Sequence, residues 1–275
     1  MSSEWSIVDK VCIVTGANSG IGRETALKLI RMGARRVIIA CRNMETGQEA
    51  VDYIKKEAEL SDSDCEKKLA LRKLDLSSMK SVREFAKDIN ENESELHCLI
   101  ENAGVWAPSK KTLTEDGFEL AFGTNHIGHF LLVKLLLDLL KKSAPSRIVV
   151  VASEAYKACL PFGLNLDNLN LEKSWWYSQN TSYAQSKLCN ILFVRELNRQ
   201  LQDTGVSCFS LHPGVIQTKL LRNQAGLLQW VFEKLHNWGI VPHACSVEDG
   251  IKTTINCATK PGIENLSGQY FSQIT

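Results

Sequence analysis

The sequence predicts an α/β protein: a single-domain, Rossmann-like, doubly wound parallel sheet of about seven strands with helices on both faces. Short β-rich runs alternate with longer helical patterns almost from the first residue, which is typical of βαβ units. Most of the short runs are nearly continuously apolar, as strands covered by helices on both faces should be. The chain has 275 residues, enough for one such core, so we expect one domain over 1–275.

The elements follow one another in regular order. Strands are predicted at 10–15, 36–41, 68–74, 97–100, 147–152 and 206–212, with a last β-like run near 268–271. Helices are predicted at 21–32, 45–59, 78–90, 125–141 and 182–202. The Lys/Glu-rich stretch 55–68 is interpreted as a solvated helix end and loop.

Two segments break this alternation, 156–181 and 220–242. The architecture leaves both free to cover a pocket rather than build the sheet. We expect 220–242 to be the substrate-covering segment, since a helical flap often excludes water from an apolar cleft. The aromatic cluster at 175–177 either lines a lipophilic pocket or covers the sheet edge.

Composition excludes several classes of protein. The 32 basic and 31 acidic side chains nearly cancel, so no global field draws the chain to nucleic acid or anionic lipid. The nine cysteines are scattered singly, which suggests neither a zinc site nor a disulfide framework and fits a reducing compartment. His126 and His129 lack an evident third ligand, so we expect no metal. With no signal peptide or uninterrupted apolar span, the protein is expected to be cytoplasmic or peripheral to an intracellular membrane, without a transmembrane segment.

A glycine-rich turn joins the first strand to the first helix. It reads Thr15-Gly16-Ala17-Asn18-Ser19-Gly20-Ile21-Gly22. Glycines permit a tight turn and close approach to a pyrophosphate, whose charge the helix N-terminus favours. Its spacing differs from the usual G-x-G-x-x-G, and a turn without a ligand is the alternative. The candidate cofactor contacts here are Gly16, Asn18, Ser19, Gly20, Ile21 and Gly22.

The end of the second strand indicates which nicotinamide cofactor binds. An acidic residue there would bind the ribose 2′-hydroxyl, whereas an arginine accommodates a 2′-phosphate. The sequence has Arg42 and no acid, which predicts NADP(H), although Arg42 is alternatively a solvated charge. After the third strand, Asp75 is expected to accept a hydrogen bond from the adenine amino group, and the Leu76 backbone is expected to contact the adenine as well. Asp75 is also a candidate cap of the next helix, and the two roles are compatible.

Tyr183 and Lys187 are the candidate catalytic pair. They lie four residues apart in a helical pattern, on one face. A free tyrosine has a pKa of about 10, and a nearby ammonium favours the phenolate, so the pair suits acid/base chemistry on an alcohol or carbonyl oxygen. Ser153 follows an apolar strand and would bind the substrate oxygen. Asn125 is predicted to open its helix and to hold a water that links Lys187 to solvent; both residues are alternatively simple caps.

These motifs together resemble the short-chain dehydrogenase/reductase superfamily. The resemblance rests on TGANSGIG, on Asn102-Ala103-Gly104 after the fourth strand, on the Asn/Ser/Tyr/Lys order, and on the run from His212 to Thr218 after the sixth. It implies a seven-stranded sheet and catalytic roles for Asn125, Ser153, Tyr183 and Lys187. The remaining cofactor contacts that it implies are Asn102, Ala103, Gly104, Pro213, Gly214, Ile216 and Thr218. Tyr183 and Lys187 are expected to contact the cofactor as well, with Lys187 holding the nicotinamide ribose.

Within the superfamily, the chain is similar to the retinol dehydrogenase group and to the reductase domain of WW-domain-containing oxidoreductase. The similar stretches are ACRN, NHIGHF, SAPSRIVVV and YAQSKLCNILF. That group implies an NADP(H)-dependent alcohol dehydrogenase/carbonyl reductase acting on a lipophilic alcohol or carbonyl, with retinol/retinal as one candidate and a possible homodimer. Alternatives are a steroid, fatty or xenobiotic carbonyl, or a cofactor-binding regulatory protein with little activity.

The chain departs from the family pattern in two respects. Glu101 stands where the family usually has asparagine, which places a carboxylate where a neutral amide stabilises the sheet. Many retinol dehydrogenases also carry an N-terminal anchor and a further C-terminal helix, and the sequence shows neither. The expectation is therefore either a soluble relative or a shortened chain.

Overall fold

The predicted doubly wound sheet is present in the computed structural model, which describes residues 5–159, 163–172, 177–214 and 246–272. Seven parallel strands lie in the order β3-β2-β1-β4-β5-β6-β7. They are β1 (Val11–Thr15), β2 (Arg36–Cys41), β3 (Leu69–Lys73), β4 (Cys98–Glu101), β5 (Ser146–Val151), β6 (Val206–His212) and β7 (Tyr270–Ser272). Every strand therefore ends at the same edge of the sheet.

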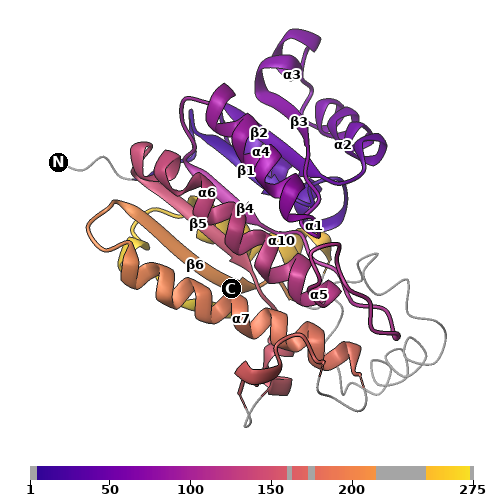
Figure 1. Cartoon of the computed structure of the whole chain (residues 1–275). Coiled ribbons are helices and arrows are strands. Elements are labelled where there is room, and N and C mark those ends of the chain that lie inside the picture. Colours follow the sequence, from indigo (N-terminus) through magenta and orange to yellow (C-terminus); the bar gives the residue numbers. More distant parts are fainter. Residues whose placement is uncertain (1–4, 160–162, 173–176, 215–245, 273–275) are drawn as a thin grey trace, which may run out of the picture.

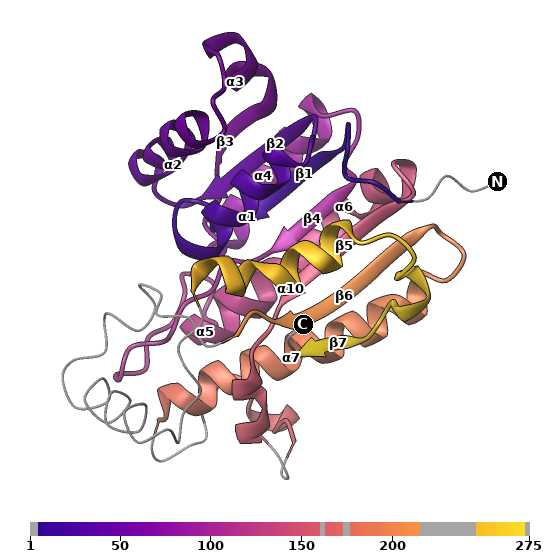
Figure 2. The ribbon, with the colours of Figure 1, turned by 180° about the vertical axis from the view of Figure 1, so that it is seen from behind.

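Helices cover both faces of this sheet (Figures 1 and 2). Leu132 and Val194 are in one core cluster, under α4 (Met79–Asn92), α6 (Gly128–Lys142) and α7 (Gln179–Gln200). Leu29 and Ile255 are in the other, under α1 (Gly20–Arg31), α2 (Met44–Glu57) and α10 (Val247–Thr259). Alternate residues of each strand face opposite clusters, which explains why the strands are apolar throughout.

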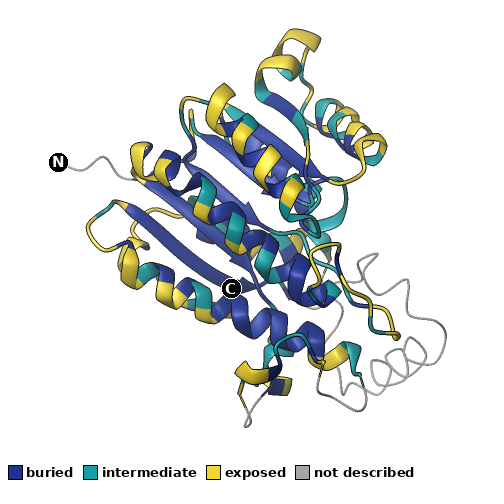
Figure 3. Cartoon of the chain, viewed as in Figure 1, coloured by how far each residue is buried: buried dark blue, intermediate teal, exposed yellow. Residues whose placement is uncertain are grey.

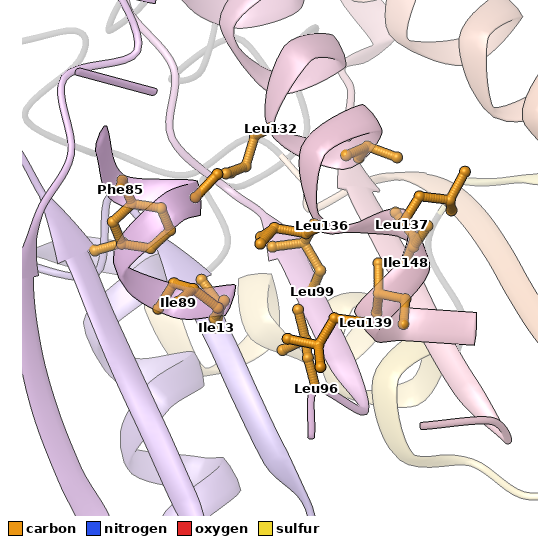
Figure 4. Packing of buried hydrophobic residues seen from close by; sticks show 14 of the residues in the cluster. Ile13, Phe85, Ile89, Leu96, Leu99, Leu132, Leu136, Leu137, Leu139 and Ile148 are labelled. Carbon is orange, nitrogen blue, oxygen red and sulfur yellow. The ribbon is translucent and has the colours of Figure 1, made fainter. Parts of the chain in front are cut away.

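The close view in Figure 4 shows how the first cluster is packed. Phe85 of α4 and Leu132 and Leu136 of α6 gather over Leu99 of β4. Figure 3 shows the strands buried and the outer faces of the helices exposed. This packing fixes α6 and α7 against β4 and β5, and so positions the side chains that these helices carry toward the sheet edge.

Two short helices were not predicted, and one helix begins earlier than expected. The Lys/Glu-rich stretch contains α3 (Asp62–Lys68), which Ser61 caps by accepting a hydrogen bond from the Asp64 N–H. Ser246 caps α10 in the same way through the Asp249 N–H. Both helices carry acidic residues in their first turn, where the helix dipole favours them.

The prediction that Asn125 opens a helix is wrong. The helix begins with α5 (Leu120–Phe122), passes through a π-helical turn (Gly123–Ile127), and continues into α6. Its cap is Glu119, whose carboxylate accepts a hydrogen bond from the Phe122 N–H. Asn125 therefore lies in the π-helical turn, an irregularity that is frequent at functional sites.

The joined helix, Leu120–Lys142, is apolar and long enough to cross a membrane by length and composition alone. The sequence predicted no such span, because the helix was expected to start later, at Asn125. More than half of the most apolar stretch is buried inside the protein. Core packing on β4 and β5 thus accounts for its apolar face.

Two predictions fall outside the described residues. The substrate-covering segment at 220–242 is one, together with the predicted contacts Ile216 and Thr218. The other is the role of the aromatic cluster at 175–177, of which Trp175 and Trp176 lie outside the described residues. The last predicted strand, near 268–271, is present as β7, two residues later at its start.

Candidate active site

The predicted site residues converge on the carboxyl edge of the sheet. Gly16 follows β1, Arg42 follows β2, Asp75 lies two residues after β3, Ser153 two residues after β5, and Pro213 follows β6. In open parallel sheets, ligands bind along this edge. Residues separated by up to about 200 positions in sequence are thereby gathered along one line.

The glycine-rich turn is packed tightly against the end of β4. A Cβ on Gly16 would lie 2.9 Å from Cα of Ala103, and one on Gly22 would lie 2.5 Å from Nδ2 of Asn102. The Asn102 amide also donates to the Thr15 carbonyl oxygen at 2.8 Å. The structure therefore gives Asn102 and Ala103 a clear role in shaping the turn.

The turn leaves open space and free polar groups above the start of α1. A Cβ on Gly20 would meet no atom within 4 Å, and Gly20 has a φ of +54°. Ser19 is the N-cap of α1, but its hydroxyl makes no capping hydrogen bond. The hydroxyl and the first N–H groups of the helix are thus available to an anion.

Arg42 lies beside this turn. Asn43, the next residue, caps α2 through the Thr46 N–H, and the Thr46 hydroxyl accepts a hydrogen bond from Nδ2 of Asn18 at 3.0 Å. Asn18 thus connects the glycine turn to the start of α2. Arg42 itself is exposed and forms no ion pair with any other described residue.

Asp75 and Leu76 are held by local contacts. The Asp75 Oδ1 atom accepts hydrogen bonds from the Ser77 N–H at 3.0 Å and the Ser77 hydroxyl at 2.6 Å. The cap of α4 is Ser78, not Asp75. Leu76 is buried, and its carbonyl oxygen lies so close to Gly128 of α6 that a side chain there would collide with it.

Tyr183, Lys187 and Ser153 come together between α7 and the end of β5. Lys187 donates a hydrogen bond to the Val151 carbonyl oxygen at 2.8 Å, and its Nζ lies 5.6 Å from the centroid of the Tyr183 ring. Burial raises the pKa of Tyr183 to about 12, opposed by a hydrogen bond with Ser153. Burial lowers the pKa of Lys187 to about 8, opposed by the charge of Glu101.

The expected lowering of the Tyr183 pKa by Lys187 is not seen in this arrangement. Ser153 is the group that lowers this pKa, and burial outweighs it. The Lys187 ammonium is held on a backbone carbonyl, over the phenol ring. The phenol is therefore an acid that keeps its proton at neutral pH.

Asn125 closes a small network beside Lys187. Its side chain accepts from the Val105 N–H at 2.7 Å and donates to the Val105 carbonyl oxygen at 3.0 Å and to the Ser186 hydroxyl at 3.1 Å. A Cβ on Gly104 would lie 3.5 Å from both Oδ1 of Asn125 and Nζ of Lys187. Gly104 thus lies beside both groups, and a methyl group there would be in van der Waals contact with each of them.

Comparison with known proteins agrees with this geometry. The family model described as short chain dehydrogenase matches residues 10–163, more than half of the chain. The chain belongs to the short-chain dehydrogenase family. This identification confirms the resemblance that the motifs indicated, and it makes the protein an oxidoreductase.

Relatives within the family are retinol dehydrogenases and a WW domain protein. Human retinol dehydrogenase 14 is 44% identical over 273 residues, which cover 95% of this chain and 77% of that protein. Human retinol dehydrogenase 12 is 44% identical over 266 residues, covering 96% and 77%. Chicken WW domain-containing oxidoreductase is 42% identical over 272 residues, covering 96% and 61%.

Solved structures show the same fold at low sequence identity. The Pseudomonas aeruginosa RhlG/NADP active-site complex superposes with a TM-score of 0.75 at 22% identity, covering 99% of this chain and 97% of that one. A short chain dehydrogenase from Escherichia coli CFT073 complexed with NADPH gives a TM-score of 0.70 at 20% identity, covering 97% of each chain.

Two further residues near the candidate site were not predicted. Trp106 stacks on Tyr183 with ring centroids 4.2 Å apart, and its buried indole N–H has no partner among the described residues. Glu119 is fully buried and accepts hydrogen bonds from the hydroxyls of Tyr177 and Ser182. Trp106 lies two residues after the Asn-Ala-Gly run, and this position is a signal that would have found it. Glu119 lies six residues before the predicted helix at 125–141, and no local pattern marked it.

The two histidines near the site are core groups. His129 binds the Thr15 hydroxyl at 2.9 Å and the Asn125 carbonyl oxygen at 3.1 Å through its two ring nitrogens. Burial lowers the pKa of His129 to about 3, so its ring is neutral. His126 binds Oδ1 of Asn190 at 3.0 Å. Both therefore stabilise the π-helical turn that carries Asn125.

Proposed function

We propose that this dehydrogenase interconverts a lipophilic alcohol and its carbonyl compound with NADP(H), using Tyr183 as the acid/base. The observation that carries the proposal is the placement of Tyr183, Ser153 and Lys187 together at the sheet edge that also holds the glycine turn. Each group there has a chemical task that fits hydride exchange at a carbonyl carbon.

The residues present fit a dinucleotide with a 2′-phosphate. The open space at Gly20 and the free Ser19 hydroxyl suit a pyrophosphate at the start of α1. The exposed guanidinium of Arg42, which has no ion-pair partner among the described residues, suits the 2′-phosphate. Asp75 keeps one carboxylate oxygen for the adenine, since Ser77 uses the other. When bound, the cofactor supplies or accepts the hydride.

The proton chemistry follows from the protonation states of the buried groups. With a pKa raised to about 12 by burial, Tyr183 carries its proton at neutral pH and donates it to a carbonyl oxygen in the reducing direction. The Ser153 hydroxyl, which already bonds to Tyr183, orients the same oxygen. In the oxidising direction the phenol must first lose its proton, which favours higher pH.

The role of Lys187 is to hold charge beside this group. With a pKa of about 8, its ammonium is present at neutral pH, where it holds the ribose of the nicotinamide half. Asn125, which lies beside Gly104 as Lys187 does, is the group proposed to hold a water that exchanges protons with Lys187.

Two observations support a lipophilic substrate. The relatives at 44% identity are named retinol dehydrogenases. Trp106 covers one face of the Tyr183 ring and offers an apolar wall next to the reacting oxygen. Retinal is therefore the first substrate to test. Steroid, fatty and xenobiotic carbonyls use the same chemistry and complete the panel.

The proposal extends to a homodimer that pairs across α6 and α7. Phe130 of α6 is 41% exposed and Leu192 of α7 is 43% exposed, so both helices offer an apolar side chain to a partner. Sedimentation velocity of the purified protein tests this part; a monomer at micromolar concentration would remove it.

The test of the proposed function combines binding and turnover. NADPH and NADH are titrated against the protein, and turnover is then followed with all-trans-retinal and the carbonyl panel. The proposal predicts tighter NADPH binding and NADPH-dependent reduction of at least one lipophilic carbonyl. NADPH binding without turnover on any compound would favour a regulatory protein, and an NADH preference would refute the role of Arg42.

A further inference from the structure

Glu101 is a buried carboxyl group on β4, the strand next to β5, and β5 carries the carbonyl oxygen that Lys187 binds. It ends β4, where it pairs with Val150 of β5, and it is 1% exposed. Side chains alternate along a strand, so Glu101 faces the same side as Leu99, the side that α4, α6 and α7 cover. Neither of its carboxylate oxygens accepts a hydrogen bond from a described residue.

The groups around Glu101 are neutral with one exception. From α6, His129 is held between Thr15 and the Asn125 carbonyl, and burial keeps its ring uncharged by lowering its pKa. From the π-helical turn, His126 is bound to Asn190, and burial lowers its pKa as well. Among the described residues, Lys187 of α7 is the one charged group whose field reaches Glu101.

Lys187 is held close to Glu101 by its hydrogen bond to the neighbouring strand, β5. The Lys187 ammonium donates to the Val151 carbonyl oxygen, and Val151 follows Val150, the residue paired with Glu101. An isolated carboxylate in such a place is strongly disfavoured. A fixed ammonium nearby offsets part of that cost, and the attraction acts equally on both partners.

We propose that Glu101 is a positioning residue whose carboxylate keeps the charge on Lys187, and so the proton supply to Tyr183, into the alkaline range. The effect on the proton supply to Tyr183 rests on the proposed function, whereas the effect on the charge of Lys187 does not. The neutral asparagine that the family pattern has at this position supplies no such charge.

The pH dependence follows from the order in which the protons leave. Burial raises the pKa of Glu101 to about 8, opposed by Lys187, so the carboxylate forms as the pH rises through mildly alkaline values. The new negative charge then holds the proton on Lys187, whose pKa burial lowers. Removing the carboxyl group must therefore let Lys187 lose its charge at a lower pH.

The test uses Glu101→Gln and Glu101→Asn, two amides that keep a polar side chain but carry no charge. Lys187 is followed directly by NMR of [ε-13C]lysine in the intact chain, with its signal assigned by its loss in Lys187→Met. We expect the pKa of Lys187 to fall by about one unit in both variants. In steady-state turnover, the alkaline limb of the pH profile should move down by the same amount.

Glu119→Gln is the matched control. Glu119 is also fully buried, but its carboxylate is hydrogen-bonded to Phe122 N–H, Tyr177 and Ser182, and its field does not reach Lys187. This variant should lose stability without moving the Lys187 titration.

The NMR titration needs no turnover, so absence of activity would count against the proposed function and leave this result standing. An unchanged Lys187 pKa in the Glu101 variants, or an equal shift in Glu119→Gln, would overturn the inference. Either amide variant suffices for the measurement if the other does not fold.

Discussion

The two halves of the candidate active site are built by opposite means. On the cofactor side, the turn from Gly16 to Gly22 is shaped by absent side chains and by backbone packed against Ala103. On the chemical side, the buried Asn125 and Lys187 and the half-buried Ser153 are held by hydrogen bonds of their polar side chains. Substitutions in the first half should therefore act through size and shape, and those in the second half through charge and hydrogen bonding.

Tyr183→Phe should have the largest effect, because it removes the proton donor while keeping the ring that stacks on Trp106. Turnover is expected to fall by about 10²- to 10⁴-fold. The Kd for NADPH should stay within about twofold of the wild-type value, because the variant loses an interaction with the reacting oxygen and not with the cofactor. Stopped-flow reduction and fluorescence titration measure the two quantities. Tyr53→Phe is the control, since it removes a phenol hydroxyl from a ring on α2 that packs on Arg23 rather than on Trp106. Equal loss of NADPH binding in Tyr183→Phe would mean that the hydroxyl serves binding instead.

Arg42→Glu tests the positive charge that Arg42 contributes to the cofactor side. The exposed guanidinium would lose its hydrogen bonds to a 2′-phosphate, each charge-assisted and worth about 1.5–3 kcal/mol. NADPH binding should weaken by about tenfold to a hundredfold, while NADH binding stays the same or improves. Arg195→Glu changes the charge equally on the exposed face of α7 and should alter neither. Parallel weakening of both cofactors would contradict the assignment.

Gly22→Ala against Gly20→Ala separates crowding from backbone strain within the same turn. The Gly22 methyl would lie 2.6 Å from the Gly16 carbonyl oxygen, which predicts a loss of about 1–3 kcal/mol in unfolding free energy and weaker NADPH binding. The Gly20 methyl meets open space, but its φ of +54° costs about 1 kcal/mol. Urea denaturation compares the two, and the account fails here if Gly20→Ala is the more destabilising.

Trp106→Leu should have the smallest effect. It removes a stacked aromatic contact worth about 0.5–1.5 kcal/mol and leaves the polar network intact. The KM for flat, conjugated carbonyls should rise more than the KM for saturated aldehydes of similar length, with kcat little changed. Initial rates on paired substrates give the comparison. An identical change for both classes would show that Trp106 does not contact the substrate.

The sequence predicted the sheet, and it predicted which residues gather at the edge of that sheet, because both depend on local patterns. Apolar strands alternate with helical periods, and the strand ends of a parallel sheet must share one edge. The helices α3 and α10 were missed although Ser61 and Ser246 are followed three residues later by Asp64 and Asp249, a signal for a capped helix start.

The surroundings of the catalytic groups could not be predicted in the same way. The helix carrying Asn125 starts at a cap, Glu119, which is stabilised by Tyr177 and Ser182 from distant segments. The protonation of Tyr183 depends on burial, because burial raises its pKa by more than the hydrogen bond with Ser153 lowers it. Such effects arise from tertiary packing, and no local pattern carries them.

Deuterium transfer tests the central claim most directly. The protein is incubated with all-trans-retinal and NADPH deuterated at the transferable C4 position, and the alcohol product is examined by mass spectrometry, beside Tyr183→Phe. The account predicts one deuterium on the product carbon with the wild-type chain and almost none with the variant, although both bind NADPH. NADPH binding without deuterium in any alcohol from retinal or the carbonyl panel would contradict it.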